Sequence, residues 1–168
     1  AFLGITNPPQ SPPPENITET YVKKSLDAIA PRMEQLKAAG LLSRGYIYAF
    51  DESKEGYSDA LRLLFGEVKQ RWPEVSTLSV LNWTPTPDMP LDIWVTLYPN
   101  LDEPAFQSAR VAFQNAGKQV WGYHCVAPSQ PQFLNTFLDV PSAKSRLLPL
   151  VGALHNLTGW LFWYTNWG

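Results

Sequence analysis

Gly45-Tyr46-Ile47-Tyr48-Ala49-Phe50-Asp51-Glu52 is an apolar and aromatic run that ends abruptly in two adjacent carboxylates. Buried strands of α/β proteins have such continuous apolar runs, and the carboxyl ends of these strands carry the chemistry of the fold. We therefore expect a buried strand here. Asp51 and Glu52, at its carboxyl end, are the strongest candidates for a functional site.

The rest of the chain alternates strands and helices. Further strands are expected at residues 76–83, 91–98, 119–125 and 159–167, and helices at residues 20–40, 57–72, 104–116 and from Pro141 toward His155. Thr18 or Thr20 can cap the first helix and Gly40 can end it, while Pro31 is expected to kink or split it. Five strands with mostly helical connections predict a parallel sheet in an α/β fold.

The sequence divides into two parts. Residues 1–19 contain a proline-rich run, Asn7-Pro8-Pro9-Gln10-Ser11-Pro12-Pro13-Pro14, which favours an extended segment or a linker. Residues 20–168 are expected to form one domain, because 45% of the 168 residues are apolar and can build a core of that size.

Composition excludes several classes of function. The formal charge of −2 leaves no excess of basic residues, so we expect no nucleic-acid partner. No apolar run is long enough to cross a bilayer, so no membrane span is expected. His124, His155 and the single cysteine, Cys125, make no convincing set of metal ligands, and His124 is interpreted as a hydrogen-bonded structural histidine. We therefore expect neither a metal nor a cofactor.

The ends of the five strands help to choose between two α/β architectures. They finish in Asp51-Glu52, Asn82-Trp83, Tyr98-Pro99, Tyr123-His124 and Asn166-Trp167. Polar and aromatic residues at every carboxyl end are typical of the active face of a TIM barrel, whereas an open nucleotide-binding sheet needs a glycine-rich turn after its first strand. That turn is missing from the sequence. Because a complete barrel needs about 250 residues, we expect the C-terminal part of a TIM (β/α)8 barrel, with about five βα units.

Four blocks of sequence follow one another along residues 46–168. They are Tyr46-Ile47-Tyr48 leading to Asp51-Glu52; Leu91-Asp92-Ile93-Trp94-Val95; Gly117-Lys118-Gln119-Val120-Trp121-Gly122-Tyr123 with Cys125 and Pro128; and Gly159-Trp160-Leu161-Phe162-Trp163 with Asn166 and Trp167. Their order and spacing together resemble the catalytic domain of glycoside hydrolase family 123, a family of TIM-barrel β-N-acetylgalactosaminidases and related proteins. The resemblance implies a glycosidase that cleaves β-linked N-acetylhexosamine, in particular N-acetylgalactosamine.

The resemblance also implies a substrate-assisted retaining mechanism, which is an exception to the scheme with two catalytic carboxylates. In such a mechanism the 2-acetamido oxygen of the substrate attacks the anomeric carbon. Glu52 would be the general acid and later the base, and Asp51 would orient the acetamido group and stabilise the positive charge on its nitrogen. Ser53 stands where members of the family often have proline, a departure that concerns the shape of the loop more than the acids.

Aromatic and amide side chains near the strand ends are the candidates for substrate binding. They are Tyr123 and Trp167, nearest to the strand ends, and then Trp121, Tyr98, Asn135 and Asn166. Flat rings can stack on the apolar faces of sugars. By the alternation of a strand, however, about half of the aromatic residues must face the helices instead.

Other polar residues have structural interpretations. Asp102-Glu103-Pro104 repeats the acidic pair, but Asp102 is expected to cap the helix that follows and Pro104 to stand in its first turn. Arg146 is expected to anchor the preceding loop through a charge-assisted bond. An acidic pair at a strand end is itself most often only a solvated loop start or a helix cap.

The expected partners are an acetamido-sugar glycan or glycolipid and the missing N-terminal part of the barrel, in the same or another chain. Two sequons, Asn16-Ile17-Thr18 and Asn156-Leu157-Thr158, favour a secreted or extracytoplasmic glycoprotein. Two alternatives remain open. One is a carbohydrate-binding or interaction protein that kept the fold and lost catalysis, and the other is a structural scaffold.

Overall fold

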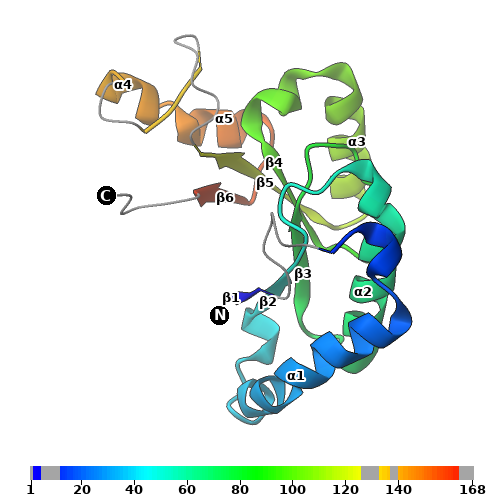
Figure 1. The fold of residues 1–168 in the computed structure, drawn as a ribbon. Coiled ribbons are helices and arrows are strands. Elements are labelled where there is room, and N and C mark those ends of the chain that lie inside the picture. The colour runs from blue at the N-terminus through cyan, green and yellow to red at the C-terminus, as the bar shows by residue number, and fades with distance from the viewer. Residues whose placement is uncertain (1, 5–11, 126–132, 137–139, 163–168) are drawn as a thin grey trace. The chain divides into compact units, whose positions relative to one another are not determined.

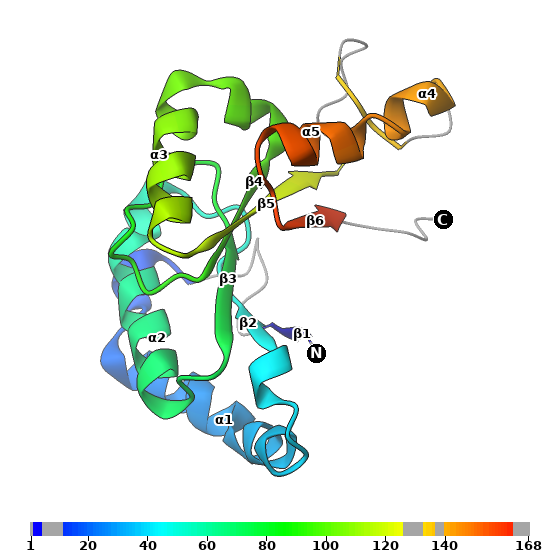
Figure 2. The same cartoon turned by 180° about the vertical axis from the view of Figure 1, so that it is seen from behind.

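The computed structural model describes residues 2–4, 12–125, 133–136 and 140–162. The chain forms two compact units. The first comprises Ala1–Trp83 with Asp88–Trp94, and the second comprises Thr84–Pro87 with Val95–Gly168. Figure 1 and Figure 2 show their elements from opposite sides.

The first unit is a parallel sheet with two helices. Its strands are β1 (Phe2–Gly4), β2 (Tyr46–Tyr48) and β3 (Ser76–Val80), in the order β1-β2-β3. Ile47 pairs with Leu3 on one side and with Thr77 on the other, and both pairings are parallel. Helices α1 (Glu19–Ala38) and α2 (Ser58–Arg71) pack together, and α2 lies alongside β3 (Figure 1).

The helices of the first unit begin, end and bury side chains as their sequences predict. Thr18 Oγ1 accepts a hydrogen bond from the N–H of Tyr21 at the start of α1, and Gly40 ends that helix with φ +66°. The buried side chains of α2 are Ala60, Leu61, Leu64, Phe65 and Val68. These residues recur at helical spacing and face the core. Pro31 lies inside α1 but does not split it.

The second unit alternates strands and helices. Strand β4 (Ile93–Leu97) begins in the first unit and continues into the second, where the strand order is β4-β5-β6. The other elements are η4 (Tyr98–Asp102), α3 (Pro104–Asn115), β5 (Gln119–His124), α4 (Ser142–Ser145), α5 (Leu148–Leu154) and β6 (Gly159–Phe162). The β5–β6 pairing is parallel, so the α/β class with parallel strands is confirmed. Among the described residues, no helix combines the length and the apolar character that a membrane span requires.

Two expected elements differ in the structure. Strand β1 lies within residues 1–19, where no strand was predicted. The helix expected from Pro141 to His155 is instead two short helices, α4 and α5. A continuous helix would place Pro149 in its interior, where proline lacks the N–H and clashes with the preceding turn. Beginning α5 at Leu148 puts this proline in the first turn, where it is tolerated.

The helix cap expected at Asp102 is wrong. Pro104 does stand in the first turn of α3, but the residue at its N-cap is Glu103. Oδ1 of Asp102 instead lies 3.4 Å from Nε2 of the buried His155. Much of the loop before α4 lies outside the described residues, so the anchoring role of Arg146 stays a prediction; in the described part, Lys144 Nζ donates to the carbonyl of Phe133 at 3.3 Å.

Two glycines of the β5–β6 pair lie directly under tryptophan rings. A Cβ atom added to Gly159 would lie 2.4 Å from the ring of Trp121, and one added to Gly122 would lie 2.6 Å from the ring of Trp160. Both distances are too short for a real Cβ atom, so a side chain at either position would force the ring or the strands to shift. Glycine at both positions therefore permits this close packing.

We expect Gly159→Ala to lower the free energy of unfolding by about 1–3 kcal/mol, because overpacking forces side chains and backbone to shift. The matched control is Gly66→Ala in α2, where an added Cβ meets nothing within 4 Å. That substitution should raise stability by roughly 0.5–1 kcal/mol, since alanine suits a helix interior better. Urea unfolding of both variants measures the difference, and equal effects would contradict the packing argument.

Candidate active site

Asp51 and Glu52 lie in a turn directly after β2, which we call the acidic turn (residues 49–53). Between the paired positions Tyr48–Leu78 and Ser53–Leu81, the chain of β2 advances five residues while that of β3 advances three. The two additional residues cannot be part of the ladder, so the chain bulges at this point. The bulge carries the acid pair at the carboxyl end of β2.

The backbone of the acidic turn is strained on both sides of Asp51. Phe50 has φ 55° and Glu52 has φ 49°, although neither is glycine. A side chain with φ in this region costs of order 1–3 kcal/mol, and such residues persist only where the surroundings hold them. The ring of Phe50 is 1% exposed and lies 5.9 Å from that of Tyr57, which fixes the turn on its apolar side.

Strand β3 and the residues after it hold the carbonyls of the acidic turn. The buried hydroxyl of Ser79 faces the carbonyl oxygens of Ala49 at 2.8 Å and Phe50 at 3.1 Å. On the other side of the acids, Trp83 Nε1 donates to the carbonyl of Ser53 at 2.9 Å. Hydrogen bonds thus hold the backbone of the turn immediately before and after the acid pair.

The two acids have different surroundings. Asp51 is half-buried, and the hydroxyl of Tyr48 donates a hydrogen bond to its Oδ1. Glu52 is exposed. A carboxylate that accepts a hydrogen bond is fixed in orientation. Asp51 therefore suits a role that needs a carboxylate held in position, while Glu52 is accessible to a substrate and to water.

A second polar and aromatic cluster lies in the second unit, around Trp160 of β6. Trp160 Nε1 donates to Nδ1 of His124 at 2.6 Å, so His124 carries its proton on Nε2 and donates to Thr136 Oγ1, at 3.1 Å. Burial lowers the pKa of His124 below its usual 6.5. The structural, hydrogen-bonded role expected for this histidine is confirmed.

Two of the expected substrate-binding residues belong to the surroundings of Trp160. The ring of Tyr98 lies 5.8 Å from that of Trp160, and its hydroxyl bonds to the backbone of Leu134. Asn135 is 2% exposed and donates to the carbonyl of Cys125 at 3.3 Å. The side chain of Tyr98 thus bonds to the backbone of Leu134, and that of Asn135 to the backbone of Cys125. Helix α5 lies on this face of the strands, since its residues Leu148, Gly152 and Ala153 line a pocket together with Trp160 (Figure 2).

Trp121 and Tyr123 lie on the opposite face of β5. Trp121 packs on Gly159, whereas Gly122 and His124 meet Trp160. Residues two apart in a strand share a face, so Tyr123 lies on the side of Trp121. The structure therefore divides the candidates of the second unit into two sets on opposite faces. Asn166 and Trp167, the remaining candidates, lie outside the described residues.

The described residues contain no group of three or more His, Cys, Asp or Glu side chains that could hold a metal ion.

A comparison with known protein families shows that residues 10–168 match the catalytic domain of glycoside hydrolase 123. The chain belongs to this family. The resemblance of the four sequence blocks is thereby confirmed, and the match covers most of the chain. No curated protein matches the sequence closely enough to count as a relative.

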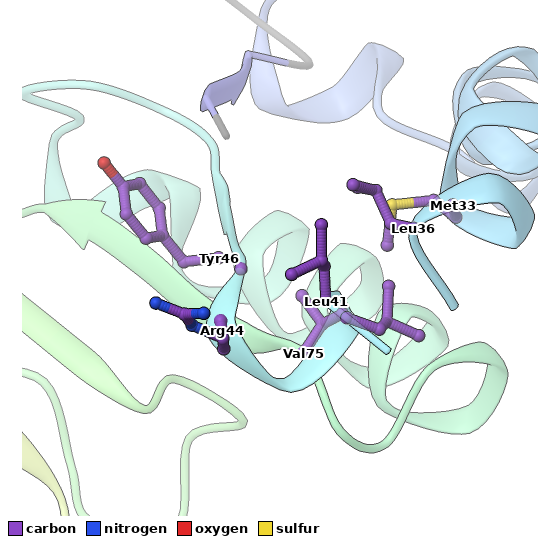
Figure 3. A pocket seen from close by; sticks show the side chains of 8 residues that line it. Met33, Leu36, Leu41, Arg44, Tyr46 and Val75 are labelled. Carbon is purple, nitrogen blue, oxygen red and sulfur yellow. The ribbon is translucent and has the colours of Figure 1, made fainter. Parts of the chain in front are cut away.

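One apolar pocket of this family 123 domain lies away from the acids. It has a volume of about 180 Å³ and is lined by Met33, Leu36, Leu41, Leu42, Arg44, Gly45, Tyr46 and Val75 (Figure 3). Tyr46 is the first residue of β2, so the pocket lies at the amino end of that strand. Because sugars need hydrogen-bonding partners beside flat apolar surface, this pocket is a poorer candidate for the active site than the carboxyl end of β2.

Sequence analysis missed three residues around the acid pair of the family 123 domain: Tyr48, Ser79 and Trp83. Tyr48 precedes Asp51 by three residues, a spacing at which a turn brings side chains together. Ser79 is a polar residue inside an otherwise buried strand, and a buried hydroxyl needs a partner. Ser53 has a buried hydroxyl without a hydrogen bond to any described residue.

Proposed function

We propose that this family 123 domain cleaves β-linked N-acetylhexosamine, in particular N-acetylgalactosamine, by a substrate-assisted retaining mechanism. The observation that carries the proposal is the acidic turn of a glycoside hydrolase domain, which presents two adjacent and differently held carboxylates at the carboxyl end of a parallel strand. Catalytic groups of barrel enzymes stand at such strand ends.

Glu52 acts as the acid and base in this proposal. It protonates the leaving oxygen while the acetamido oxygen of the substrate attacks the anomeric carbon and closes a five-membered ring. It then removes a proton from the water that opens this ring, so configuration is retained. An exposed carboxyl group suits both steps, because the leaving oxygen and then the attacking water can reach it.

Asp51 orients the acetamido group and stabilises the positive charge that develops on its nitrogen. The hydrogen bond from Tyr48 supports this role, because it fixes the carboxylate while leaving its second oxygen to accept the substrate N–H. A charge that is already held in position stabilises a transition state without the cost of reorienting the surrounding groups.

We also propose that the parallel strands are the C-terminal part of a TIM barrel and that Trp121 and Tyr123 contribute to sugar stacking. Their shared face of β5, opposite to the face that α5 covers, supports this assignment. Tyr98 and Asn135 are weaker candidates, since their polar atoms already bond to the backbone. Asn16 and Asn156 are exposed in both sequons, as a secreted glycoprotein would require, and that location stays a prediction.

The proposal is tested by hydrolysis of an aryl β-N-acetylgalactosaminide by the full-length protein. We expect release of the β-anomer first and inhibition by a thiazoline that mimics the cyclised intermediate. If the protein hydrolyses the substrate but the thiazoline does not inhibit it, the substrate-assisted mechanism is contradicted and the glycosidase activity stands. Binding of glycans with no hydrolysis of any acetamido glycoside would favour the carbohydrate-binding alternative over an enzyme.

A further inference from the structure

Ser79 and Trp83 are bonded to the acidic turn but not to the acids themselves. The hydroxyl of Ser79 is fully buried and shares its single proton between the carbonyls of Ala49 and Phe50. Trp83 bonds to the carbonyl of Ser53. These contacts join residues about thirty positions apart in the sequence, so they tie the turn to a different strand.

We propose that Ser79 and Trp83 are positioning residues, which hold the acidic turn in its strained form and so place Asp51 and Glu52. The inference rests on the proposed function for its effect on catalysis. Its structural part, that the two side chains determine the conformation of the turn, stands independently of the reaction.

The strain of the turn is the reason for this assignment. Phe50 and Glu52 have φ values of 55° and 49°, and an isolated chain would relax both residues to negative φ. The carbonyl of Phe50 is held by Ser79 inside this strained segment. Loss of that bond removes the contact that favours the left-handed form, and the peptide between Phe50 and Asp51 is then free to turn.

The support extends beneath the turn as well. Ser53 pairs with Leu81 in a parallel bridge, and the carbonyl of Leu81 accepts a hydrogen bond from the buried Trp94 Nε1 at 3.0 Å. The far end of the turn is thus fixed by the bridge and by Trp83. Ser79 holds the near end, where the ladder with β3 is interrupted.

Thr77 offers a matched control on the same strand. It is also fully buried, and its hydroxyl donates to a backbone carbonyl, that of Pro90, at 2.9 Å. Thr77 lies two residues before Ser79 and therefore on the same face of β3. It contacts the segment around Asp92 and not the acidic turn. Thr77→Ala thus removes buried hydrogen bonds of the same kind, including that from the Asp92 N–H at 3.0 Å, without touching the acidic turn.

The experiment compares Ser79→Ala, Ser79→Thr, Trp83→Phe and Thr77→Ala in the full-length protein. For each, kcat and KM are measured on an aryl β-N-acetylgalactosaminide, together with Tm and hydrogen exchange of the peptide that contains residues 49–53. We expect Ser79→Ala to lower kcat by about 10- to 100-fold with little change in KM, because misplacement of a catalytic group by 1 Å can cost 10²-fold. Exchange in the acidic turn should rise.

The other variants separate positioning from stability. Thr77→Ala should lower Tm about as much as Ser79→Ala while kcat and exchange of the turn stay at the wild-type level. Ser79→Thr, which restores a hydroxyl, should recover most of kcat, and Trp83→Phe should show a smaller loss than Ser79→Ala. If Ser79→Ala changes Tm alone, like Thr77→Ala, the positioning role is overturned.

Hydrogen exchange also separates this inference from the proposed function. If the wild type hydrolyses no acetamido glycoside while Ser79→Ala still loosens the turn selectively, the proposed function fails and the structural role of Ser79 stands. If the wild type is active and Ser79→Ala leaves both kcat and exchange unchanged, the positioning inference fails and the proposed function stands.

Discussion

Glu52→Gln is expected to lower kcat on an aryl β-N-acetylgalactosaminide by about 10²- to 10⁴-fold, the contribution typical of a general acid and base. Glutamine has the size and shape of glutamate but cannot transfer a proton to the leaving oxygen or take one from water. Because the side chain is exposed, its replacement should leave Tm almost unchanged. A loss of rate without a loss of stability assigns the effect to chemistry.

The size of the loss should depend on the leaving group. A nitrophenolate leaves without protonation, so for this substrate kcat/KM, which reports the first step, is affected little by Glu52→Gln, and the loss of kcat comes from the second step, in which Glu52 is the base. A sugar alcohol needs the proton, so hydrolysis of a natural glycan should fall much further. Steady-state kinetics on a series of aryl glycosides of increasing leaving-group pKa measures this trend, and an equal loss along the whole series would contradict the acid role.

Glu55→Gln is the matched control for this measurement. Glu55 is also an exposed glutamate, and it lies three residues farther along, in the 3-10 turn η3 (Glu55–Tyr57). The same change of charge close to the acidic turn should alter kcat by less than about twofold, since exposed charges interact only weakly. If both variants lose activity to the same extent, the effect is one of local charge and not of proton transfer.

The elements that the sequence predicts well are those whose signals are local. Helix α2 agrees with its apolar spacing almost to the residue, and its end coincides with the approach to Pro73. The cap of α1 at Thr18 and its end at Gly40 follow in the same way from residues adjacent to the helix. Periodicity and capping are properties of a short window, so a single sequence contains them.

The acid pair could be found from sequence, but its support could not. Asp51 and Glu52 stand out because they end an apolar run. The bond from Ser79 to the turn depends on which strands are neighbours and on their register, and the turn is about thirty residues away in the chain. The strained φ of Phe50 has no sign in the sequence either, since a bulky residue normally argues against that conformation.

The substrate-binding candidates show a further limit. Alternation along β5 puts Trp121 and Tyr123 on one face of the strand, but it does not say which face α5 covers. The two glycines identify the faces. Gly122 leaves space for the ring of Trp160 on one face, and Gly159 leaves space for the ring of Trp121 on the other. Which face of a strand admits a tryptophan depends on the neighbouring strand, so it requires the pairing of β5 with β6.

Asp51→Asn is expected to lower kcat by about 10²- to 10³-fold, the loss found when one preorganised electrostatic contact to a transition state is removed. Asparagine has a single oxygen, which can accept the hydrogen bond of Tyr48, and its NH2 group cannot accept one from the substrate N–H. The variant therefore loses the negative charge together with one acceptor. The loss in kcat measures the stabilisation of positive charge on the acetamido nitrogen together with the hydrogen bond to its N–H.

Affinity for the cyclised intermediate should fall together with kcat. A thiazoline that becomes protonated in the site carries the positive charge that Asp51 is proposed to stabilise, so its inhibition constant should rise about as much as kcat falls. A neutral substrate carries no such charge in the ground state, so KM should change little. Asp59→Asn, an exposed aspartate in the first turn of α2, is the control and should change neither quantity.

A fluoro sugar offered to the wild type distinguishes the two ways in which a carboxylate can act in a retaining glycosidase. If Asp51 were the nucleophile of a two-carboxylate mechanism, a 2-deoxy-2-fluoro glycoside would accumulate as a covalent adduct on Asp51, and mass spectrometry of the peptide would detect it. In the substrate-assisted mechanism the fluoro sugar lacks the attacking acetamido oxygen and forms no adduct. An adduct on Asp51, or thiazoline inhibition that is unchanged in Asp51→Asn, would therefore contradict the role proposed for this residue.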